Sequence, residues 1–243
     1  MLQHTGIKRT FRHNFLLAVF FAFVAGMVNV AGLLLLYVFT TNITGHFGEL
    51  AVAITTKNTI NVIKVFIWIL TFLSGSFFAS ICVNGLNKFS PKISYIFPII
   101  IEMVCFLVLI FLYEKLPRYQ DIDFRIFLLF FSMGLQNGIV SVVSGNVVRT
   151  THLTGMITDF GLAFGEILFN KEHKKHLQKK MLLSAAIVIS FLCGGIIAGI
   201  YSNRLNIHFF YIPIIVLFFI VMFDYSKTYI LRSVRFIKKM NVE

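Results

Sequence analysis

Long apolar runs separated by short polar segments make up most of the chain. Six of these runs are close to the roughly 20 apolar residues that a helix needs to cross a bilayer core. Each run is bounded by charged or turn-forming residues, and little chain remains for a separate soluble domain. The pattern predicts an all-α polytopic membrane protein in which 1–243 form a single integral membrane domain. The expected spans are about Phe15–Thr40, Val62–Val83, Ile93–Tyr113, Phe124–Val148, Met181–Tyr201 and Phe209–Tyr225.

The composition agrees with this pattern, because 58% of the residues are hydrophobic and only 13% are charged. A soluble domain is usually about 45–50% apolar and about 25% charged. The first run could also be read as a cleaved signal peptide, since three basic residues precede it. That run is about 25 residues long, which is long for the apolar part of a signal peptide. We therefore expect it to be a membrane span.

The net charge of +12 would suggest a nucleic-acid partner in a soluble protein. If the N-terminus is cytoplasmic, 16 of the 22 Lys and Arg residues fall on the inner side of the six expected spans and 6 on the outer side. This is the bias that the positive-inside rule requires. We therefore expect a multipass protein of the cytoplasmic (inner) membrane with both termini in the cytoplasm, a lipid bilayer around it and no nucleic-acid partner.

The second half of the chain repeats features of the first half in the same order. The segment TTNITG at 40–45 is matched 110 residues later by TTHLTG at 150–155. The segment YIFPII at 95–100 is matched 115 residues later by FYIPII at 210–215. Two further sets of matches are Gly26 and Asn29 with Gly134 and Asn137, and Gly75 and Ala79 with Gly194 and Ala198.

Each repeat unit contains three spans, with repeat 1 at about 15–113 and repeat 2 at about 124–230. An odd number of spans reverses the second copy in the membrane. The sequence thus predicts two three-helix inverted repeats, an architecture that recurs in secondary transporters. The two Thr-Gly segments should then lie on opposite sides of the membrane.

Glu102 lies inside the third expected span, roughly 13 Å from its start and near the middle of a core about 30 Å thick. An ionised carboxylate at this depth costs about 2.5–3.5 kcal/mol on insertion scales. Two interpretations stay open. The group is either a proton- or cation-coupling carboxyl that faces a cavity, or a protonated structural glutamate bonded to a neighbouring helix.

The fourth span is the most polar. Gly134, Gly138, Ser141 and Gly145 share one helical face, which is typical of a packing seam that lets helices approach closely. Other polar groups in these spans must be satisfied by protein or water inside the membrane. We favour cavity lining over helix-to-helix bonding for Asn29, Gln136, Asn137, Ser144, Asn146 and Arg149.

The two Thr-Gly segments are expected to interrupt their helices, because glycine and threonine favour caps and turns over helix interiors. A break at membrane depth exposes backbone groups to a solute or ion. A second apolar helix, Met156–Phe169, follows the later break and carries Asp159, which is a possible partner of Arg149. Ordinary loop turns are the alternative. The break residues expected at the pathway are Thr41, Asn42, Thr44, Gly45, Thr151, Thr154 and Gly155.

Other chemistry has little support in the sequence. The three cysteines lie inside apolar spans, and lysines surround His173 and His176, so we expect no disulfide and no metal site. Phosphate-binding loops, nucleophile elbows and zinc-protease motifs are absent. We therefore expect no cofactor, and we expect that the protein is not an enzyme.

Four motifs carry a family resemblance: Gly26-x-x-Asn29, Thr44-Gly45, Gly134-x-Gln136-Asn137 and Thr150-Thr151-x-Leu153-Thr154-Gly155. Together they resemble the YoaK-like family of bacterial inner-membrane proteins, over nearly the whole chain. The resemblance implies about six spans, but it implies no substrate, because the function of the family is unknown.

The chain departs from the family pattern in three places. The family usually has Asp where Asn29 stands, Asn where His46 stands, and basic residues just after Asn137, where this chain has Ile139 and Val140. An ion-coupling role of the family's Asp would therefore not carry over to Asn29.

The leading functional hypothesis is a small transporter or permease, with spans one and four forming a solute or ion pathway at the midplane. Six spans are few for a complete pathway, which makes a homodimer plausible. The alternative is a non-transporting membrane scaffold, sensor or stress-related protein, whose basic loop and tail would contact partners or lipid. A water-filled cavity that reaches Asn29 and Glu102 would favour transport.

Overall fold

The computed structural model describes residues 10–88, 90–115, 122–169 and 174–223. The expected pair of loop histidines includes His173, which lies outside these ranges, as do the basic tail at 227–239 and the end of the expected sixth span at 224–225. Every regular element in the described ranges is helical. The elements are α1 (Phe11–Leu36), α2 (Ile43–Thr55), α3 (Thr59–Leu86), α4 (Pro91–Lys115), α5 (Ile122–Ser144), α6 (Leu153–Phe169), α7 (Lys174–Leu205) and the 3₁₀ helix η2 (Asn206–Phe210).

Five helical stretches in the described chain are long and apolar enough to cross a bilayer. Four of them contain α1, α3, α4 and α5, and the fifth is the 50-residue stretch Lys174–Phe223. This last stretch contains both of the final two expected spans, because a further helix at 211–223 follows η2. That helix lies beside α7, and side chains such as Ile189 and Phe223 line one apolar groove. The expected number of six crossings stays a prediction.

Large apolar side chains cover the outer faces of the long helices. On α3, Phe66, Leu73 and Phe77 are 50%, 60% and 66% exposed. Apolar surface on this scale is rare on soluble monomers and marks a membrane or an interface. The exposed faces and the five apolar stretches together indicate a multipass membrane protein.

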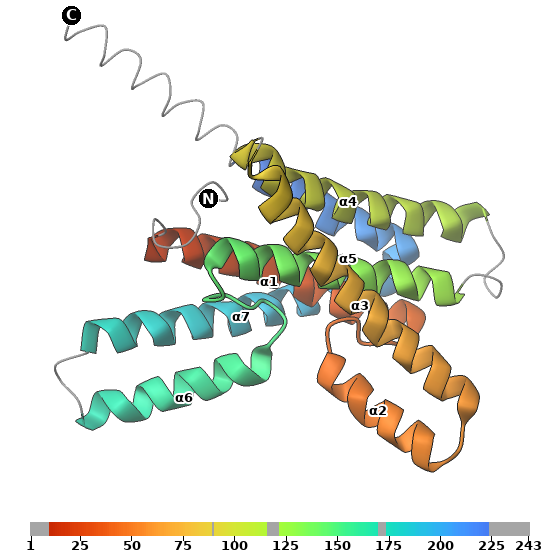
Figure 1. Cartoon of the computed structure of the whole chain (residues 1–243), viewed down its shortest axis with the longest axis horizontal. Coiled ribbons are helices and arrows are strands. Elements are labelled where there is room, and N and C mark those ends of the chain that lie inside the picture. The colour runs from red at the N-terminus through yellow and green to blue at the C-terminus, as the bar shows by residue number, and fades with distance from the viewer. Residues whose placement is uncertain (1–9, 89, 116–121, 170–173, 224–243) are drawn as a thin grey trace, which may run out of the picture.

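Two pairs of helices cross at glycines. α1 crosses α7 and α5 crosses α3, as Figure 1 shows. A Cβ atom on Gly26 would collide with the carbonyl oxygen of Phe191 in α7, and one on Gly134 would collide with the carbonyl oxygen of Phe72 in α3. Helix backbones can approach this closely only where one of them lacks a side chain.

The chain turns back sharply after α1. Tyr37 adopts left-handed backbone angles, with φ of 58°, and ends the helix. The Val38 N–H donates to the Gly32 carbonyl oxygen at 3.3 Å, and the Thr41 N–H donates to Asn29 Oδ1 at 3.0 Å. Residues 37–42 therefore run back along α1 before α2 begins.

The same reversal follows α5, where Gly145 and Asn146 have φ of 66° and 64°. The Val148 N–H then donates to the Ser144 hydroxyl at 3.0 Å. The breaks lie at 37–42 and 145–152, so they include the expected residues Thr41, Asn42 and Thr151 but not the two Thr-Gly pairs. Thr44-Gly45 and Thr154-Gly155 belong to the first turns of α2 and α6, because the residues ahead of them supply the turns.

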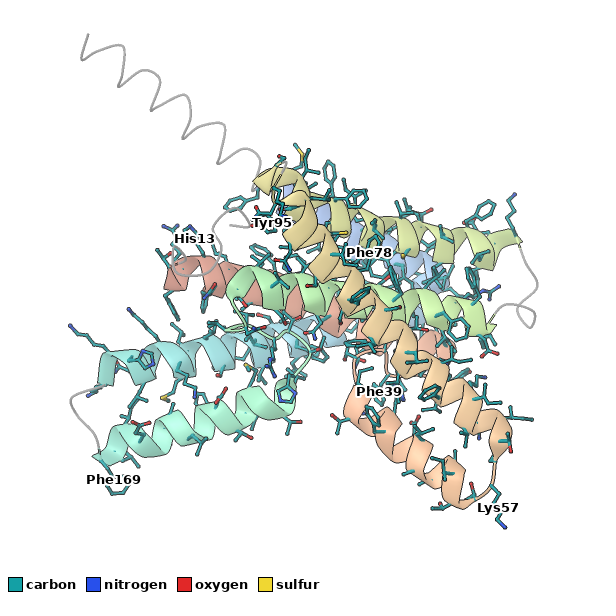
Figure 2. The ribbon with its side chains drawn as sticks, in the orientation of Figure 1. His13, Phe39, Lys57, Phe78, Tyr95 and Phe169 are labelled. Atoms are coloured by element: carbon teal, nitrogen blue, oxygen red, sulfur yellow. The ribbon has the colours of Figure 1, made fainter. Side chains whose placement is uncertain are left out.

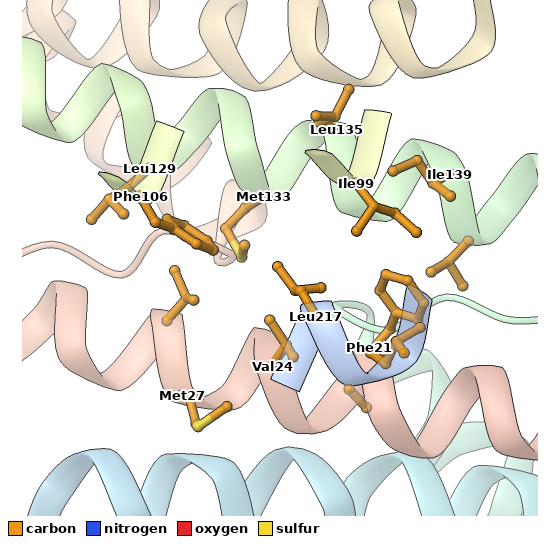
Figure 3. Close-up of a cluster of buried hydrophobic side chains, with 14 of the residues drawn as sticks. Phe21, Val24, Met27, Ile99, Phe106, Leu129, Met133, Leu135, Ile139 and Leu217 are labelled. Atoms are coloured by element: carbon orange, nitrogen blue, oxygen red, sulfur yellow. The ribbon is translucent and has the colours of Figure 1, made fainter. Parts of the chain in front are cut away.

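The core lies between α1, α4, α5 and the helix at 211–223. Figure 3 shows Phe21 and Val24 of α1 facing Leu217, with Ile99 and Met133 above them. All five side chains are fully buried. This packing joins α1, α4 and α5 to the helix at 211–223.

Candidate functional site

A polar cavity of about 640 Å³ lies where the two broken segments meet. This volume falls within the range of about 300–1,000 Å³ that is common for small-molecule sites. In Figure 2, Phe39, one of the wall residues, lies at the inner end of the α2–α3 hairpin, whereas Lys57 lies at its outer tip. The walls consist of Asn29, Phe39, Thr41, Asn42, Ile43, Thr44, Phe72, Asn137, Ser141, Asn146, Arg149, Thr151, His152, Leu153, Thr154 and Phe191.

Most wall positions occur in pairs that the sequence repeat equates. The segment 41–44 corresponds to 151–154, 110 residues later, and all eight of these residues line the cavity. Asn29 corresponds to Asn137, and the offset of 119 that relates Gly75 to Gly194 also relates Phe72 to Phe191. The two halves of the chain therefore contribute equivalent positions to one site.

Side chains of the first break hold its backbone in place. Asn29 is 6% exposed, and its Oδ1 accepts the Thr41 N–H. Asn42 caps α2, because its Oδ1 accepts the Gly45 N–H at 3.1 Å. The Gly45 backbone is thus used in the cap, and Gly45 is not among the cavity walls.

His46 is a buried residue that the sequence analysis noted only as a departure from the family. It is 2% exposed and lies edge-on to the rings of Trp68 and Phe130. Its Nε2 lies 2.7 Å from the Phe39 carbonyl oxygen, and its Nδ1 lies 2.9 Å from a Glu49 carboxylate oxygen. The imidazole therefore links the break at 37–42 to α2 and α3, just behind the cavity wall.

A second cavity of about 410 Å³ adjoins the first and shares Asn146, Arg149 and Thr154 with it. Gly155 and Asp159 line this second cavity. The expected pairing of Arg149 with Asp159 is wrong. Asp159 instead forms an ion pair with a lysine of α7, at 2.8 Å between Lys180 Nζ and the carboxylate. The α6–α7 hairpin brings this lysine beside Asp159, and sequence spacing alone could not reveal that.

Glu102 and Gln136 lie apart from the walls of these cavities. Both are fully buried. Gln136 Nε2 donates to the Phe21 carbonyl oxygen at 2.9 Å, so this side chain joins α5 to α1. Neither carboxyl oxygen of Glu102 has a hydrogen-bond partner among the described residues. The cavity thus reaches Asn29 but not Glu102.

The expected pathway residues that do line the main cavity come from both repeats. They are Asn29, Thr41, Asn42, Thr44, Asn137, Asn146, Arg149, Thr151 and Thr154. The apolar walls, chiefly Phe39, Phe72 and Phe191, were not predicted from the sequence. The repeat offset could have suggested the last two, because it relates one to the other. Within the described ranges, no group of three or more His, Cys, Asp or Glu side chains could hold a metal ion.

The apolar spans and the polar cavity between them define a multipass integral membrane protein. Residues 17–223 match the family model described as "Protein of unknown function (DUF1275)", and the chain belongs to this family. The chain is also 26% identical over 202 residues to the "UPF0700 transmembrane protein YoaK" of Bacillus subtilis (strain 168). That alignment covers 82% of this chain and 88% of the relative, so the resemblance to the YoaK-like family is confirmed. No solved structure matches the chain.

Proposed function

We propose that the protein is a small transporter or permease whose solute binds in the 640 Å³ cavity between the two breaks. The observation that carries this proposal is that equivalent segments of both halves, 41–44 and 151–154, line one cavity. Interrupted helices whose first turns face a central site are the usual way in which secondary transporters expose backbone groups to a solute. Catalysis has no comparable support in these walls.

The proposal includes an inverted repeat of two three-span units. The glycine crossings support it, because Gly26 and Gly134 are equivalent in the sequence repeat and contact equivalent positions, Phe191 and Phe72. Both crossings join helices that should run in the same direction through the membrane, namely the first and fifth spans and the second and fourth. In this scheme η2 and 211–223 supply the described part of the sixth span.

α2 and α6 are re-entrant helices in this proposal. Their 13 and 17 residues correspond to about 20 and 26 Å of helix, which is shorter than a core about 30 Å thick. Each begins at the cavity and ends near the following span. The distribution of Lys and Arg supports an orientation with both termini in the cytoplasm of a bacterial inner membrane.

Alternating access can be tested with cysteines at the two equivalent wall positions, Thr44→Cys and Thr154→Cys. Both should be made in a chain whose three natural cysteines are replaced by alanine. In proteoliposomes of known orientation, we expect each cysteine to react with a membrane-impermeant thiol reagent added from either side. The reason is that a transporter exposes its central site to both sides in turn.

Two results would contradict the proposal. Cysteines at 44 and 154 that react from neither side, in protein that elutes as a single folded species, would mean that no open cavity exists. Cysteines that react from one side only would mean that the site never crosses the membrane. The second result would favour the sensor alternative, because a sensor needs a site that is open to one side.

A further inference from the structure

The electrostatics of the main cavity set the charge of its ligand. Arg149 is an exposed wall residue, and no Asp or Glu lies among the described residues that form the walls. Asp159, which lines the adjoining cavity together with Arg149, forms a 2.8 Å ion pair with Lys180. The cavity therefore carries a cation whose charge no carboxylate of its own walls balances.

A second observation concerns Asn29, which is only 6% exposed and yet lines the cavity. Its Oδ1 accepts the Thr41 N–H, and its two Nδ2–H groups are donors. These groups have no hydrogen-bond partner among the described residues. A buried amide held in this way presents a donor, and a donor requires an acceptor on the ligand.

The N-terminal ends of α2 and α6 add to the positive potential at the cavity. Ile43 and Leu153, the first residues of α2 and α6, are both wall residues. The N-terminal end of a helix carries a partial positive charge of roughly half an elementary charge. Arg149, the Asn29 amide and two such helix ends together favour a negative group at this place.

Three aromatic rings also line the cavity. Phe72 and Phe191 line the cavity from α3 and α7, and Phe39 lines it from the first break. A fully hydrated inorganic ion would leave these rings without a partner. A solute with an apolar part would bury that part against them.

We propose that the cavity binds a small organic anion, with its carboxylate or phosphate at Arg149 and Asn29 and its apolar part against Phe72 and Phe191. This inference rests on the proposed function, since it names the class of solute for the same site. It depends on the walls alone, so it can be tested without knowledge of the natural substrate.

The first experiment compares charged thiol reagents of equal size on the purified full chain. Thr154→Cys, in the cysteine-free background, is treated with an anionic sulfonatoethyl and a cationic trimethylammonium-ethyl methanethiosulfonate. Thr55→Cys, at the exposed end of α2 and outside the cavity, is the reference. We expect the anionic-to-cationic rate ratio at 154 to exceed the ratio at 55 by roughly tenfold, because a cleft of one charge sign concentrates counter-ions.

Two variants show whether Arg149 is the cause. Arg149→Gln should reduce the ratio at 154 to the value at 55, whereas Arg149→Lys should keep it high. Equal or cation-favouring rates at an accessible Thr154→Cys would overturn the anion inference and leave the transporter proposal standing. If Thr154→Cys reacts with neither reagent while Thr55→Cys reacts with both, the cavity is closed and the transporter proposal itself fails.

The second experiment uses three aromatic probes that differ mainly in charge: benzoate, benzylammonium and benzyl alcohol. We expect benzoate to slow the reaction of Thr154→Cys with neutral N-ethylmaleimide several-fold more than the other two probes at equal concentration. It should slow Thr44→Cys to a similar extent, because both positions line one cavity. Equal protection by all three probes, stronger protection by benzylammonium, or no protection by any of them would overturn the proposal of an organic-anion site.

Discussion

His46 shows what one residue does behind the cavity. The Phe39 carbonyl oxygen can only accept a hydrogen bond, so Nε2 must donate to it. Its Nδ1 lies 2.9 Å from a Glu49 carboxylate oxygen. The ring therefore joins the Phe39 carbonyl of the first break to Glu49 in α2.

We predict that His46→Gln destabilises the protein, because the substitution leaves the Phe39 carbonyl without its donor from the buried ring. The expected loss is about 1–3 kcal/mol in the free energy of unfolding. His208→Gln is the matched control, since His208 is half exposed and lies 3.6 Å from a half-exposed Glu114. Thermal unfolding in detergent measures both. A loss for His208→Gln as large as that for His46→Gln would contradict the assignment.

At the scale of helices, glycine position decides which pairs can cross. Gly26 and Gly134 each lie against a phenylalanine carbonyl of the partner helix, whereas Gly199 has open space where a side chain would begin. The helix crossings therefore need glycine at positions 26 and 134, but not at position 199. The sequence repeat already pointed to Gly26 and Gly134, because both match across the two halves.

We predict that Gly26→Ala weakens the packing of α1 on α7, because the new methyl group collides with the Phe191 carbonyl. Overpacking of this kind usually costs about 1–3 kcal/mol. Gly199→Ala, on the same partner helix, should be neutral or slightly stabilising, since alanine favours helix. The comparison uses the midpoint of thermal unfolding and the labelling rate of Thr154→Cys. A Gly26→Ala protein as stable as Gly199→Ala would refute the close crossing.

For the whole molecule, the proposed inverted arrangement would place the two helical hairpins on opposite sides of the membrane. Figure 2 shows Lys57 at the tip of α2–α3 and Phe169 at the end of α6, far from Lys57. Phe169 is 90% exposed. Under the proposed orientation, the first tip faces outward and the second faces the cytoplasm.

We therefore predict that Lys57→Cys reacts with an impermeant thiol reagent only from outside intact cells. Phe169→Cys should react only after the cells are opened. Gly165→Cys, one turn before Phe169, is a useful companion because a side chain there meets no neighbour within 4 Å. Labelling of positions 57 and 169 from the same side would exclude the inverted topology, whatever the cavity binds.

Several features were predictable from the sequence because they depend on composition and local pattern. The length of the apolar runs determines that the helices enter a membrane. Thr41, Thr44, Thr151 and Thr154 were predictable as wall residues, because helix-breaking motifs repeated 110 residues apart mark equivalent positions.

The tertiary structure alone decided which of these residues share a cavity. The chain turns back along α1 and α5, which moves the breaks upstream of the Thr-Gly pairs. The α6–α7 hairpin places Lys180 beside Asp159, and the two form an ion pair. Arg149 lines the main cavity instead of pairing with Asp159. Glu102 is buried away from the cavity walls because it lies on the face of α4 that packs inward. Sequence spacing does not encode these choices, since they depend on which helices pack against one another.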